Sequence, residues 1–329
     1  MKKILVTGGG GFIGHHLVKK LLEKNEVFVV DNFSRGARTR LENHTNLKIL
    51  EVDITDFEQL KKNLSKYSFD KIFHLAAING TDNFYNRPIE VMDVGILGCF
   101  NILKFAKLNK IQKLIIASSA EVYQSANIIP TPEEIPLIIP DAKNPRFSYG
   151  LSKIYTEFYS YHFALKHGIN MCIFRPHNVY GPDMGLKHVI PEFILKFLIG
   201  METNKLIEIE PKGSVDATRA FCYVDDIISG LELISRKNEG VNIYNIGNTN
   251  QISINDLIGK ISDILNCDFR LISNKNLHIG GTEKRCPDIS KISSIGFNCK
   301  TNLDEGLINT IDWYKNNLKM VKSVSNDIY

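Results

Sequence analysis

The chain has 329 residues, enough for one large α/β domain and a smaller lobe, because single hydrophobic cores stop growing at roughly 250–300 residues. A hydrophobic content of 43% and a charged content of 23% are those of a soluble globular protein and exclude a largely disordered chain. The formal net charge of +4 is too small to indicate nucleic acid as a partner.

Short apolar runs rich in β-branched residues alternate with longer segments of helical spacing. The runs are KILV (3–6), VFVVD (27–31), KILEVD (48–53), KIFHLAA (71–77), KLIIAS (113–118) and MCIFRP (171–176). This alternation predicts an α/β fold of the Rossmann type, a doubly wound parallel sheet with ligands outside the carboxyl ends of its strands.

After Asn178 the pattern changes, with helical segments at 190–198 and 254–265 and a strand-like stretch at 242–247. We expect residues 1–176 to form the Rossmann domain, joined by a returning segment near 215–246. Residues 177–329 are expected to form mostly a smaller C-terminal lobe for the substrate. Residues 319–329 lack a clear apolar face and are expected to fray.

Glycines follow the first predicted strand, in TGGGGFIG at 7–14, and a helical segment comes next. Two templates fit, Gly9-x-Gly11-x-x-Gly14 and Gly8-x-x-Gly11-x-x-Gly14. Because glycine has no Cβ, backbone N–H groups can approach a pyrophosphate at the positive end of the helix. The order of strand, glycines and helix predicts a dinucleotide site.

The second predicted strand ends in Asp31, whose carboxylate can accept hydrogen bonds from a ribose diol and would repel a 2′-phosphate. This favours NAD over NADP. Arg35 and Arg38 lie nearby and could accommodate a phosphate, but we interpret them as loop charges. The predicted cofactor-binding residues are Gly8, Gly11, Phe12, Ile13, Gly14, Asp31, Asn32, Asp53, Ile54, Leu75, Ala76, Ala77, Tyr149, Lys153 and Pro176.

Tyr149 and Lys153 are four residues apart at the start of a helical segment, so they share one face of a helix. A phenol is a poor base at its usual pKa of about 10. An ammonium group beside it, together with a cationic nicotinamide ring, favours the phenolate. Tyr149 could then take a proton from a sugar hydroxyl while hydride leaves to NAD.

With these residues in place, the chain resembles the extended short-chain dehydrogenase/reductase family, that is, the NAD-dependent nucleotide-sugar epimerases, dehydratases and related enzymes. The resemblance covers nearly the whole length and is carried, in order, by TGGGGFIG, VVDN, DITD, HLAA, SSAEVY, YGLSK, RPHNVYGP, TRAFCYVDDI, YNIGN and RCPDISK. It implies that Ser119 works with Tyr149 and Lys153, whereas Ser118 is expected to cap backbone groups.

Glu121 bears on the reaction that comes after oxidation at carbon 4. Dehydratases and some decarboxylases of the family look like this sequence there, and the resemblance implies that the glutamate takes the carbon-5 proton. However, Ala120 cannot donate a proton to a leaving hydroxyl. Decarboxylases often have GPRM where this chain has Gly181-Pro182-Asp183-Met184, and the Asp183 carboxylate would repel a uronate. Gln124 replaces the usual glycine, and NGTDNFYNRP (79–88) is not generic.

Our working hypothesis is therefore a 4-epimerase or a 4-dehydrogenase that gives a 4-keto sugar. A 4,6-dehydratase or decarboxylase using Glu121 is the alternative. A non-catalytic NAD-binding sensor or scaffold is the rival of another class, although such proteins usually lose catalytic residues that are present here.

The resemblance also implies a nucleotide-diphosphate sugar as substrate, held by Asn178, Arg219 and Arg285, since arginine makes bidentate contacts to phosphate. It further implies a homodimer through the segment near 89–107 and the helix that carries Tyr149. His74 and His177 have no second ligand at usable spacing, so no metal is expected.

The cysteines form no Cys-x-x-Cys pair, which predicts neither a zinc site nor disulfides and favours reduced thiols in a cytoplasmic protein. They are Cys99, Cys172, Cys222, Cys267, Cys286 and Cys299. The apolar run after Lys2 and Lys3 breaks into glycines after Val6, too short for a signal peptide or a membrane span.

Overall fold

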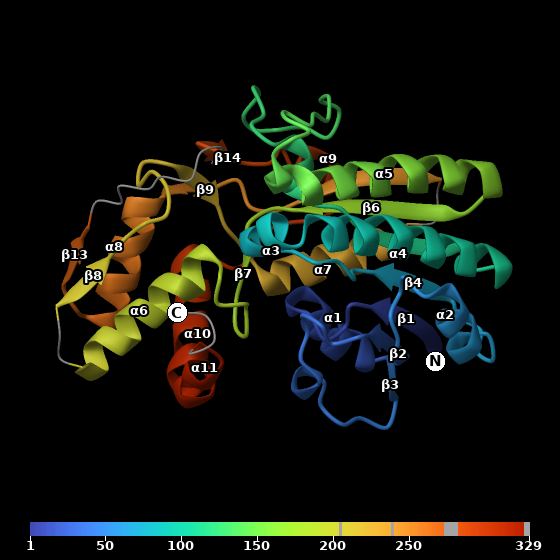
Figure 1. Cartoon of the computed structure of the whole chain (residues 1–329), viewed down its shortest axis with the longest axis horizontal. Coiled ribbons are helices and arrows are strands. Elements are labelled where there is room, and N and C mark those ends of the chain that lie inside the picture. Colours follow the sequence, from blue (N-terminus) through green and yellow to red (C-terminus); the bar gives the residue numbers. More distant parts are fainter. Residues whose placement is uncertain (204–205, 238–239, 273–281, 326–329) are drawn as a thin grey trace.

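The centre of the molecule is a seven-stranded parallel sheet in the order β11-β6-β5-β4-β1-β2-β3 (Figure 1). This computed structural model describes residues 1–203, 206–237, 240–272 and 282–325. The strands are β1 (Lys2–Thr7), β2 (Asn25–Asp31), β3 (Leu47–Glu51), β4 (Lys71–His74), β5 (Lys113–Ala117), β6 (Asn170–Pro176) and β11 (Val241–Ile246). The predicted Rossmann-type α/β fold is confirmed. All five residues of β5 are buried, as expected for a strand covered on both faces.

Helices cover both faces of this sheet, and each face has its own hydrophobic core. One face carries α1 (Phe12–Leu22) and α7 (Val224–Ser235), and the other carries α2 (Phe57–Leu64), α4 (Pro88–Leu108) and α5 (Ser148–His167). The strand order reverses between β1 and β4. In sheets of this kind, ligands bind outside the carboxyl ends of the strands at that reversal.

A smaller lobe stands beside the carboxyl ends of the strands, at the left of Figure 1. Its longer helices are α6 (Val189–Thr203), α8 (Ile254–Leu265), α10 (Leu303–Asn316) and α11 (Leu318–Ser325). Its short strands are β7 (Val179–Tyr180), β8 (Ile207–Ile209), β9 (Thr218–Ala220), β10 (Cys222–Tyr223), β12 (Gln251–Ser253), β13 (Phe269–Leu271) and β14 (Lys284–Arg285). They pair as β12-β9-β14, β13-β8 and β10-β7.

Five short helices complete the described chain. They are η1 (Arg38–Arg40), α3 (Thr81–Asn86), η2 (Ala120–Tyr123), η3 (Pro145–Phe147) and α9 (Ser290–Ser293). Three of them, α3, η2 and η3, lie in the loops that follow β4 and β5 and therefore border the carboxyl edge of the sheet.

Helix ends follow the local sequence. Asp56, Ser253 and Asn302 cap α2, α8 and α10, and each side chain accepts a hydrogen bond from an N–H of the first turn. Gly168 ends α5 with a φ of +64°, a conformation that glycine adopts without cost.

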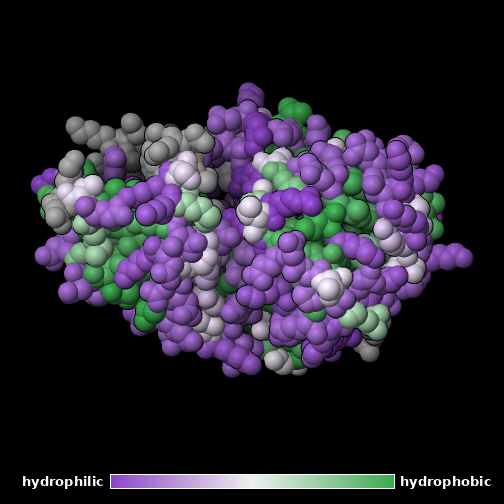
Figure 2. Space-filling model, turned by 90° about the horizontal axis from the view of Figure 1, so that it is seen from below, coloured by the Kyte–Doolittle hydropathy of each residue, from purple (hydrophilic) through white to green (hydrophobic). Residues whose placement is uncertain are grey.

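The expectation that residues 319–329 fray is wrong for the described part, because α11 continues to Ser325. Val321 is buried and packs into the main core, which stabilises this last helix. Residues 326–329 lie outside the described residues. None of the described helices is both long and apolar enough to span a membrane. The face seen from below is mostly hydrophilic, with hydrophobic side chains in separate patches (Figure 2).

Candidate active site

The glycine loop turns between β1 and α1 with almost no room for side chains. A Cβ at Gly8, where φ is +74°, would lie 2.6 Å from the Ala76 nitrogen. A Cβ at Gly14 would lie 2.1 Å from the Gly8 carbonyl oxygen, and the Gly11 N–H donates to the same oxygen at 3.1 Å. The closest backbone approaches thus involve Gly8 and Gly14, which favours the template Gly8-x-x-Gly11-x-x-Gly14.

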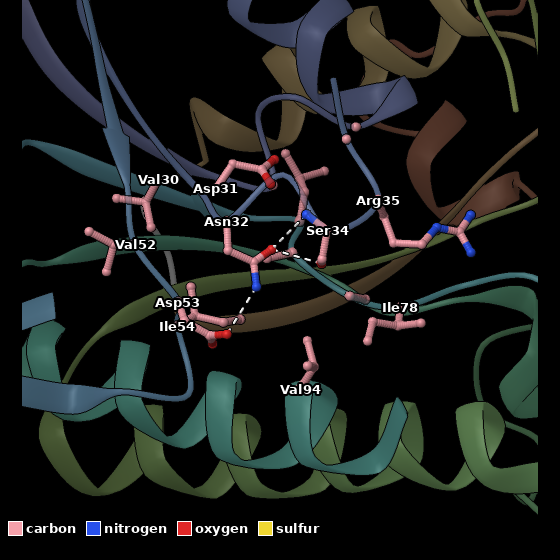
Figure 3. A pocket seen from close by; sticks show the side chains of 16 residues that line it. Val30, Asp31, Asn32, Ser34, Arg35, Val52, Asp53, Ile54, Ile78 and Val94 are labelled. Carbon is pink, nitrogen blue, oxygen red and sulfur yellow. Dashed lines mark hydrogen bonds between the residues drawn. The ribbon is translucent and has the colours of Figure 1, made fainter. Parts of the chain in front are cut away.

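A pocket opens beside this loop at the reversal between β1 and β4. Its wall contains Gly8, Gly11, Val30, Asp31, Asn32, Ser34, Arg35, Gly36, Val52, Asp53, Ile54, Leu75, Ala76, Ala77, Ile78 and Val94. Figure 3 shows Asp31, Asn32 and Asp53 along one side of it. Nine predicted cofactor-binding residues therefore line one pocket: Gly8, Gly11, Asp31, Asn32, Asp53, Ile54, Leu75, Ala76 and Ala77.

Asp31 is fixed at the pocket by two backbone groups. Its Oδ2 accepts from the Gly10 N–H at 2.9 Å, and its Oδ1 accepts from the Phe33 N–H at 2.8 Å. Burial raises the pKa of this carboxyl, whereas the two N–H groups act to lower it. The carboxylate is thus held in place with acceptor capacity left for a ribose diol.

Neither nearby arginine is joined to Asp31. The Arg35 guanidinium donates to the Asn79 carbonyl oxygen and points away from Asp31 in Figure 3. The exposed Arg38 lies 3.9 Å from a Glu51 carboxylate oxygen. This arrangement matches the interpretation of Arg38 as a loop charge, but it gives Arg35 a partner beside the pocket that the sequence did not indicate.

Six predicted cofactor residues lie outside the wall of that pocket: Phe12, Ile13, Gly14, Tyr149, Lys153 and Pro176. Phe12 and Ile13 open α1, and their side chains pack against the main core. Only their backbone N–H groups, which have no intrahelical partner in the first turn, can serve a phosphate. Pro176 ends β6.

Ser119, Tyr149 and Lys153 come together at the end of β5. The Lys153 ammonium lies 5.6 Å from the centre of the Tyr149 ring and donates to the Ala117 carbonyl oxygen at 2.8 Å. Ser119 caps η2 and hydrogen-bonds with the Tyr149 phenol. Tyr149 and Lys153 are both buried. The constellation expected from the resemblance is therefore assembled.

The sequence predicts that Lys153 and the cationic nicotinamide ring together favour the phenolate of Tyr149, whereas burial in the protein acts in the opposite direction. Burial raises the pKa of Tyr149, and this outweighs the opposing effects of Ser119 and Arg35. Burial also lowers the pKa of Lys153 to about 8. Lys153 lies beside Tyr149 as predicted, but desolvation is the largest influence on the pKa of both side chains.

Glu121 is locked in an ion pair. Its Oε1 accepts from Arg285 Nη1 at 2.7 Å. Burial acts to raise the pKa of Glu121, but Arg285, with smaller contributions from Arg146 and Arg219, holds it below its usual value. The group is therefore a carboxylate with a cation already bound, and such a carboxylate is a weak base.

Arg219 and Arg285 stand side by side, because they pair in register on the parallel strands β9 and β14. Arg219 donates to carbonyl oxygens of Thr218 and Thr282, and burial together with Arg285 lowers its pKa to about 10. The two adjacent, half-buried guanidinium groups repel each other, so the pair favours an anionic ligand. Asn178 donates to the Ala220 carbonyl oxygen at 3.1 Å, next to Arg219 in the chain.

Arg146 and Phe84 also lie at the site, although neither is among the residues predicted from the sequence. Arg146 lies on η3, acts electrostatically on Glu121, and has a buried Nε atom without a hydrogen-bond partner. Phe84 lies on α3, within the NGTDNFYNRP segment, and stacks on Tyr149. The unusual segment was the signal for Phe84, whereas nothing in the sequence placed Arg146 near Glu121.

Both histidines considered as ligands have protein partners. His74 Nδ1 lies 2.7 Å from Thr7 Oγ1, and His177 Nε2 lies 3.1 Å from Asn245 Oδ1. All six cysteines are free in the structure. Within the described chain, one group brings three ligand-type atoms within 4.8 Å of one another: Cys222, Asp226 and Cys299.

That group has a structural explanation. Both carboxylate oxygens of Asp226 accept backbone hydrogen bonds, from the Lys300 N–H at 2.9 Å and the Thr301 N–H at 3.1 Å. Asp226 thereby ties α7 to the loop before α10.

Comparisons with known proteins agree with this geometry. A model described as the NAD dependent epimerase/dehydratase family matches residues 4–247. A putative UDP-glucose 4-epimerase of Methanocaldococcus jannaschii is 33% identical over 95% of this chain and 99% of its own length. The UDP-glucuronic acid decarboxylase 3 of Arabidopsis thaliana is 31% identical over 93% of this chain and 86% of its own.

Two solved structures are similar over nearly their whole length. A UDP-glucose 4-epimerase of Thermotoga maritima, solved with UDP-glucose, has a TM-score of 0.86 at 31% identity and covers 96% of this chain and 99% of its own. A dTDP-glucose 4,6-dehydratase of Streptomyces venezuelae, solved with NAD, has a TM-score of 0.84 at 25% identity, covering 97% and 98%. The predicted resemblance, the enzyme class and NAD as cofactor are thereby confirmed, and the chain belongs to the NAD dependent epimerase/dehydratase family.

Proposed function

We propose that this protein oxidises carbon 4 of a nucleotide-linked sugar, as a 4-epimerase or as a 4-dehydrogenase that releases the keto sugar. The main support for the proposal is that Ser119, Tyr149 and Lys153 lie together beside the cofactor pocket. The ion pair between Glu121 and Arg285 is the second observation. Oxidation needs the first three residues, whereas the ion pair bears on the fate of the 4-keto sugar.

In the proposed mechanism, the Tyr149 oxygen takes the proton of the carbon-4 hydroxyl. Bound NAD supplies the acceptor for the hydride that leaves carbon 4. Ser119, hydrogen-bonded to the phenol, orients the sugar hydroxyl towards it. Lys153 holds its positive charge beside the Tyr149 ring, where it stabilises the phenolate that must form before the proton can be taken; the transfer then leaves Tyr149 as the neutral phenol. In an epimerase the same Tyr149 phenol would return its proton to the carbon-4 oxygen when the keto sugar is reduced again.

The ion pair of Glu121 favours this reaction over dehydration or decarboxylation. A base that removes a carbon-5 proton works best with a pKa near the operating pH, and Arg285 shifts that of Glu121 the other way. The side chain of Ala120, beside it, offers no acid for a departing hydroxyl. The family includes dehydratases and decarboxylases, so these reactions remain outcomes for the experiment to test.

We propose that Arg219 and Arg285 hold the diphosphate of the substrate, with Asn178 beside them. Three guanidinium groups act electrostatically on the single carboxylate of Glu121: those of Arg285, Arg146 and Arg219. The excess positive charge fits a dianionic diphosphate. Relatives named as acting on UDP-sugars make a UDP-sugar the first substrate to test.

We also propose that the protein is a homodimer through the outer faces of α4 and α5. Large apolar side chains are exposed on both helices, with Leu97 at 47%, Leu108 at 59%, Phe158 at 70% and Leu165 at 56% exposure. Exposed apolar groups of this size on adjacent helices favour burial against a partner. The division into domains at residue 176 and the cytoplasmic location remain predictions.

The test is turnover of a panel of UDP-, GDP-, CDP- and dTDP-sugars in deuterium oxide, followed by NMR. A 4-epimerase gives the carbon-4 epimer without deuterium at carbon 5, and a 4-dehydrogenase gives a 4-keto sugar with one NADH for each product. Deuterium at carbon 5 with loss of the carbon-6 oxygen would overturn the proposal in favour of a 4,6-dehydratase. Release of carbon dioxide from a uronate would do so in favour of a decarboxylase.

A further inference from the structure

The phenol ring of Tyr149 is stacked on an aromatic ring from another part of the chain. Phe84, on α3, lies with its ring centre 5.1 Å from that of Tyr149 and its plane inclined by 11°. Both residues are buried, with exposures of 3% and 6%. Together with Ile78 and Val91 they form a small hydrophobic cluster separate from the two cores of the sheet. This cluster therefore packs around Tyr149 at the active site and is not part of the packing of the central sheet.

The helix that carries Phe84 has only six residues and is fastened at its beginning and along its outer side. Arg35, in the wall of the cofactor pocket, donates to the Asn79 carbonyl oxygen just before α3. Asn83 donates to the same oxygen at 2.7 Å. Lys187 forms an ion pair with Asp82 at 2.5 Å, which joins α3 to the loop before α6.

These contacts fix the position of the ring rather than only its burial. A free aromatic side chain can turn about χ1 and χ2, and a stacked neighbour removes that freedom at the cost of its own mobility. A base must lie within hydrogen-bond reach of the proton that it takes, so the direction of the Tyr149 C–O bond bears on the rate.

We propose that Phe84 is a positioning residue for the proton transfer by Tyr149, holding the phenol ring in its reactive orientation and keeping water from it. The inference rests on the proposed function. It gives the segment 79–88, which departs from the generic family pattern, a role in the reaction that is distinct from binding the nucleotide.

The Phe84 ring has two expected effects on Tyr149: it fixes the orientation of the phenol and it shields the phenol from water. Loss of the stack lets Tyr149 turn, which lowers kcat. It also lets water reach the phenol, which favours the charged phenolate and lowers the pKa that burial now raises. The charged groups around Tyr149, which are Arg35, Glu121 and Lys153, stay in place, as do Asp82 and Arg87 at the two ends of α3.

The test compares Phe84→Leu with Phe84→Tyr and with Tyr85→Leu, the matched control at the next, exposed position of α3. For Phe84→Leu we expect kcat to fall by about 10- to 100-fold, as displacements near 1 Å do. In the same variant, the part of the pH profile in which kcat/KM rises with pH should move to lower pH. Phe84→Tyr keeps a ring and should restore both quantities, and Tyr85→Leu should change neither.

A second measurement does not need turnover. In spectra of tyrosine-labelled protein, the ring signals of Tyr149 are those lost in Tyr149→Phe, and they should shift in Phe84→Leu but not in Tyr85→Leu. If the Tyr149 ring signals do not shift in Phe84→Leu, the stacking is wrong. If Phe84→Leu and Tyr85→Leu lose kcat equally and the pH dependence of kcat/KM does not move, the positioning role is wrong. A wild-type protein that turns over no sugar of the panel would instead overturn the proposed function, with the spectra still testing the stack.

Discussion

The cofactor half of this site and its proposed substrate half are built in different ways. The cofactor pocket is made largely by backbone and small residues that come after consecutive strands of one sheet, and most of its wall comes from the first 78 residues. The substrate half depends on charged side chains from three distant segments: η2 with Glu121, β9 with Arg219, and β14 with Arg285.

The two halves should respond differently to substitution. A pocket formed by close backbone approach fails when any atom is added, whereas a cluster of charges fails when one member is removed and its partner is left buried. Variants of the two halves should therefore lose different properties, and variants at the reacting centre should lose turnover without losing either ligand.

The largest effect is expected for Tyr149→Phe, which removes the proton acceptor where the two halves meet. Turnover should fall by about 10²- to 10⁴-fold, the usual contribution of a positioned acid or base. The affinity for NAD, measured by fluorescence titration, should stay close to that of the wild type, because Tyr149 lies outside the wall of the cofactor pocket. Full turnover by this variant would contradict the mechanism and show that the phenol is not the proton acceptor.

The next largest effect tests the cofactor half with Gly14→Ala. The added Cβ would lie 2.1 Å from the Gly8 carbonyl oxygen, so the glycine loop must shift. We expect a loss of NAD affinity and a lower Tm in calorimetry. Gly259→Ala is the control, because nothing lies within 4 Å of its Cβ on α8. It should stabilise the fold by about 0.5–1 kcal/mol, and equal behaviour of the two variants would refute the close approach.

The substrate half is tested by Arg285→Ala. Removing this guanidinium takes away the proposed contact to the substrate and the cation that pairs with Glu121. We expect KM for the nucleotide sugar to rise by about 10- to 100-fold, since hydrogen bonds to charged groups contribute about 1.5–3 kcal/mol. NAD affinity should not change. Arg38→Ala, which removes an exposed loop charge, should leave KM as it is; a similar rise in both variants would speak against the placement.

The smallest effect on turnover is expected for Glu121→Gln. A 4-epimerase or 4-dehydrogenase should keep turnover within about tenfold, because the carboxylate is not its base. The variant should be less stable than the wild type at neutral pH. The pKa of Glu121 is lowered in the folded state, so its contribution exists above the pKa of the unfolded chain and disappears as pH falls through the folded value. Denaturant titrations at pH 7 and at low pH measure this, and complete loss of turnover would favour proton removal by Glu121.

The sequence was most informative where function follows from contiguous chemistry. Glycines between a strand and a helix, with Asp31 at the end of the next strand, predict a dinucleotide pocket because the strand order places those segments together. Tyr149 and Lys153 share a helix face through their spacing alone. Phe12 and Ile13 show the limit of such reasoning, since a motif position does not tell whether the side chain or the backbone faces the ligand.

Tertiary structure decided the rest. Glu121 and Arg285 are 164 residues apart, and their ion pair arises only because β14 lies beside β9 against the end of β5. The stack of Phe84 on Tyr149 likewise depends on how a short helix is fastened across the site. Local spacing determines which groups one element presents, whereas the pKa of a carboxyl or phenol depends on burial and on charges that folding brings from elsewhere. The sequence could therefore predict the family and its cofactor, but not the charge state of Glu121, on which the proposed choice of reaction depends.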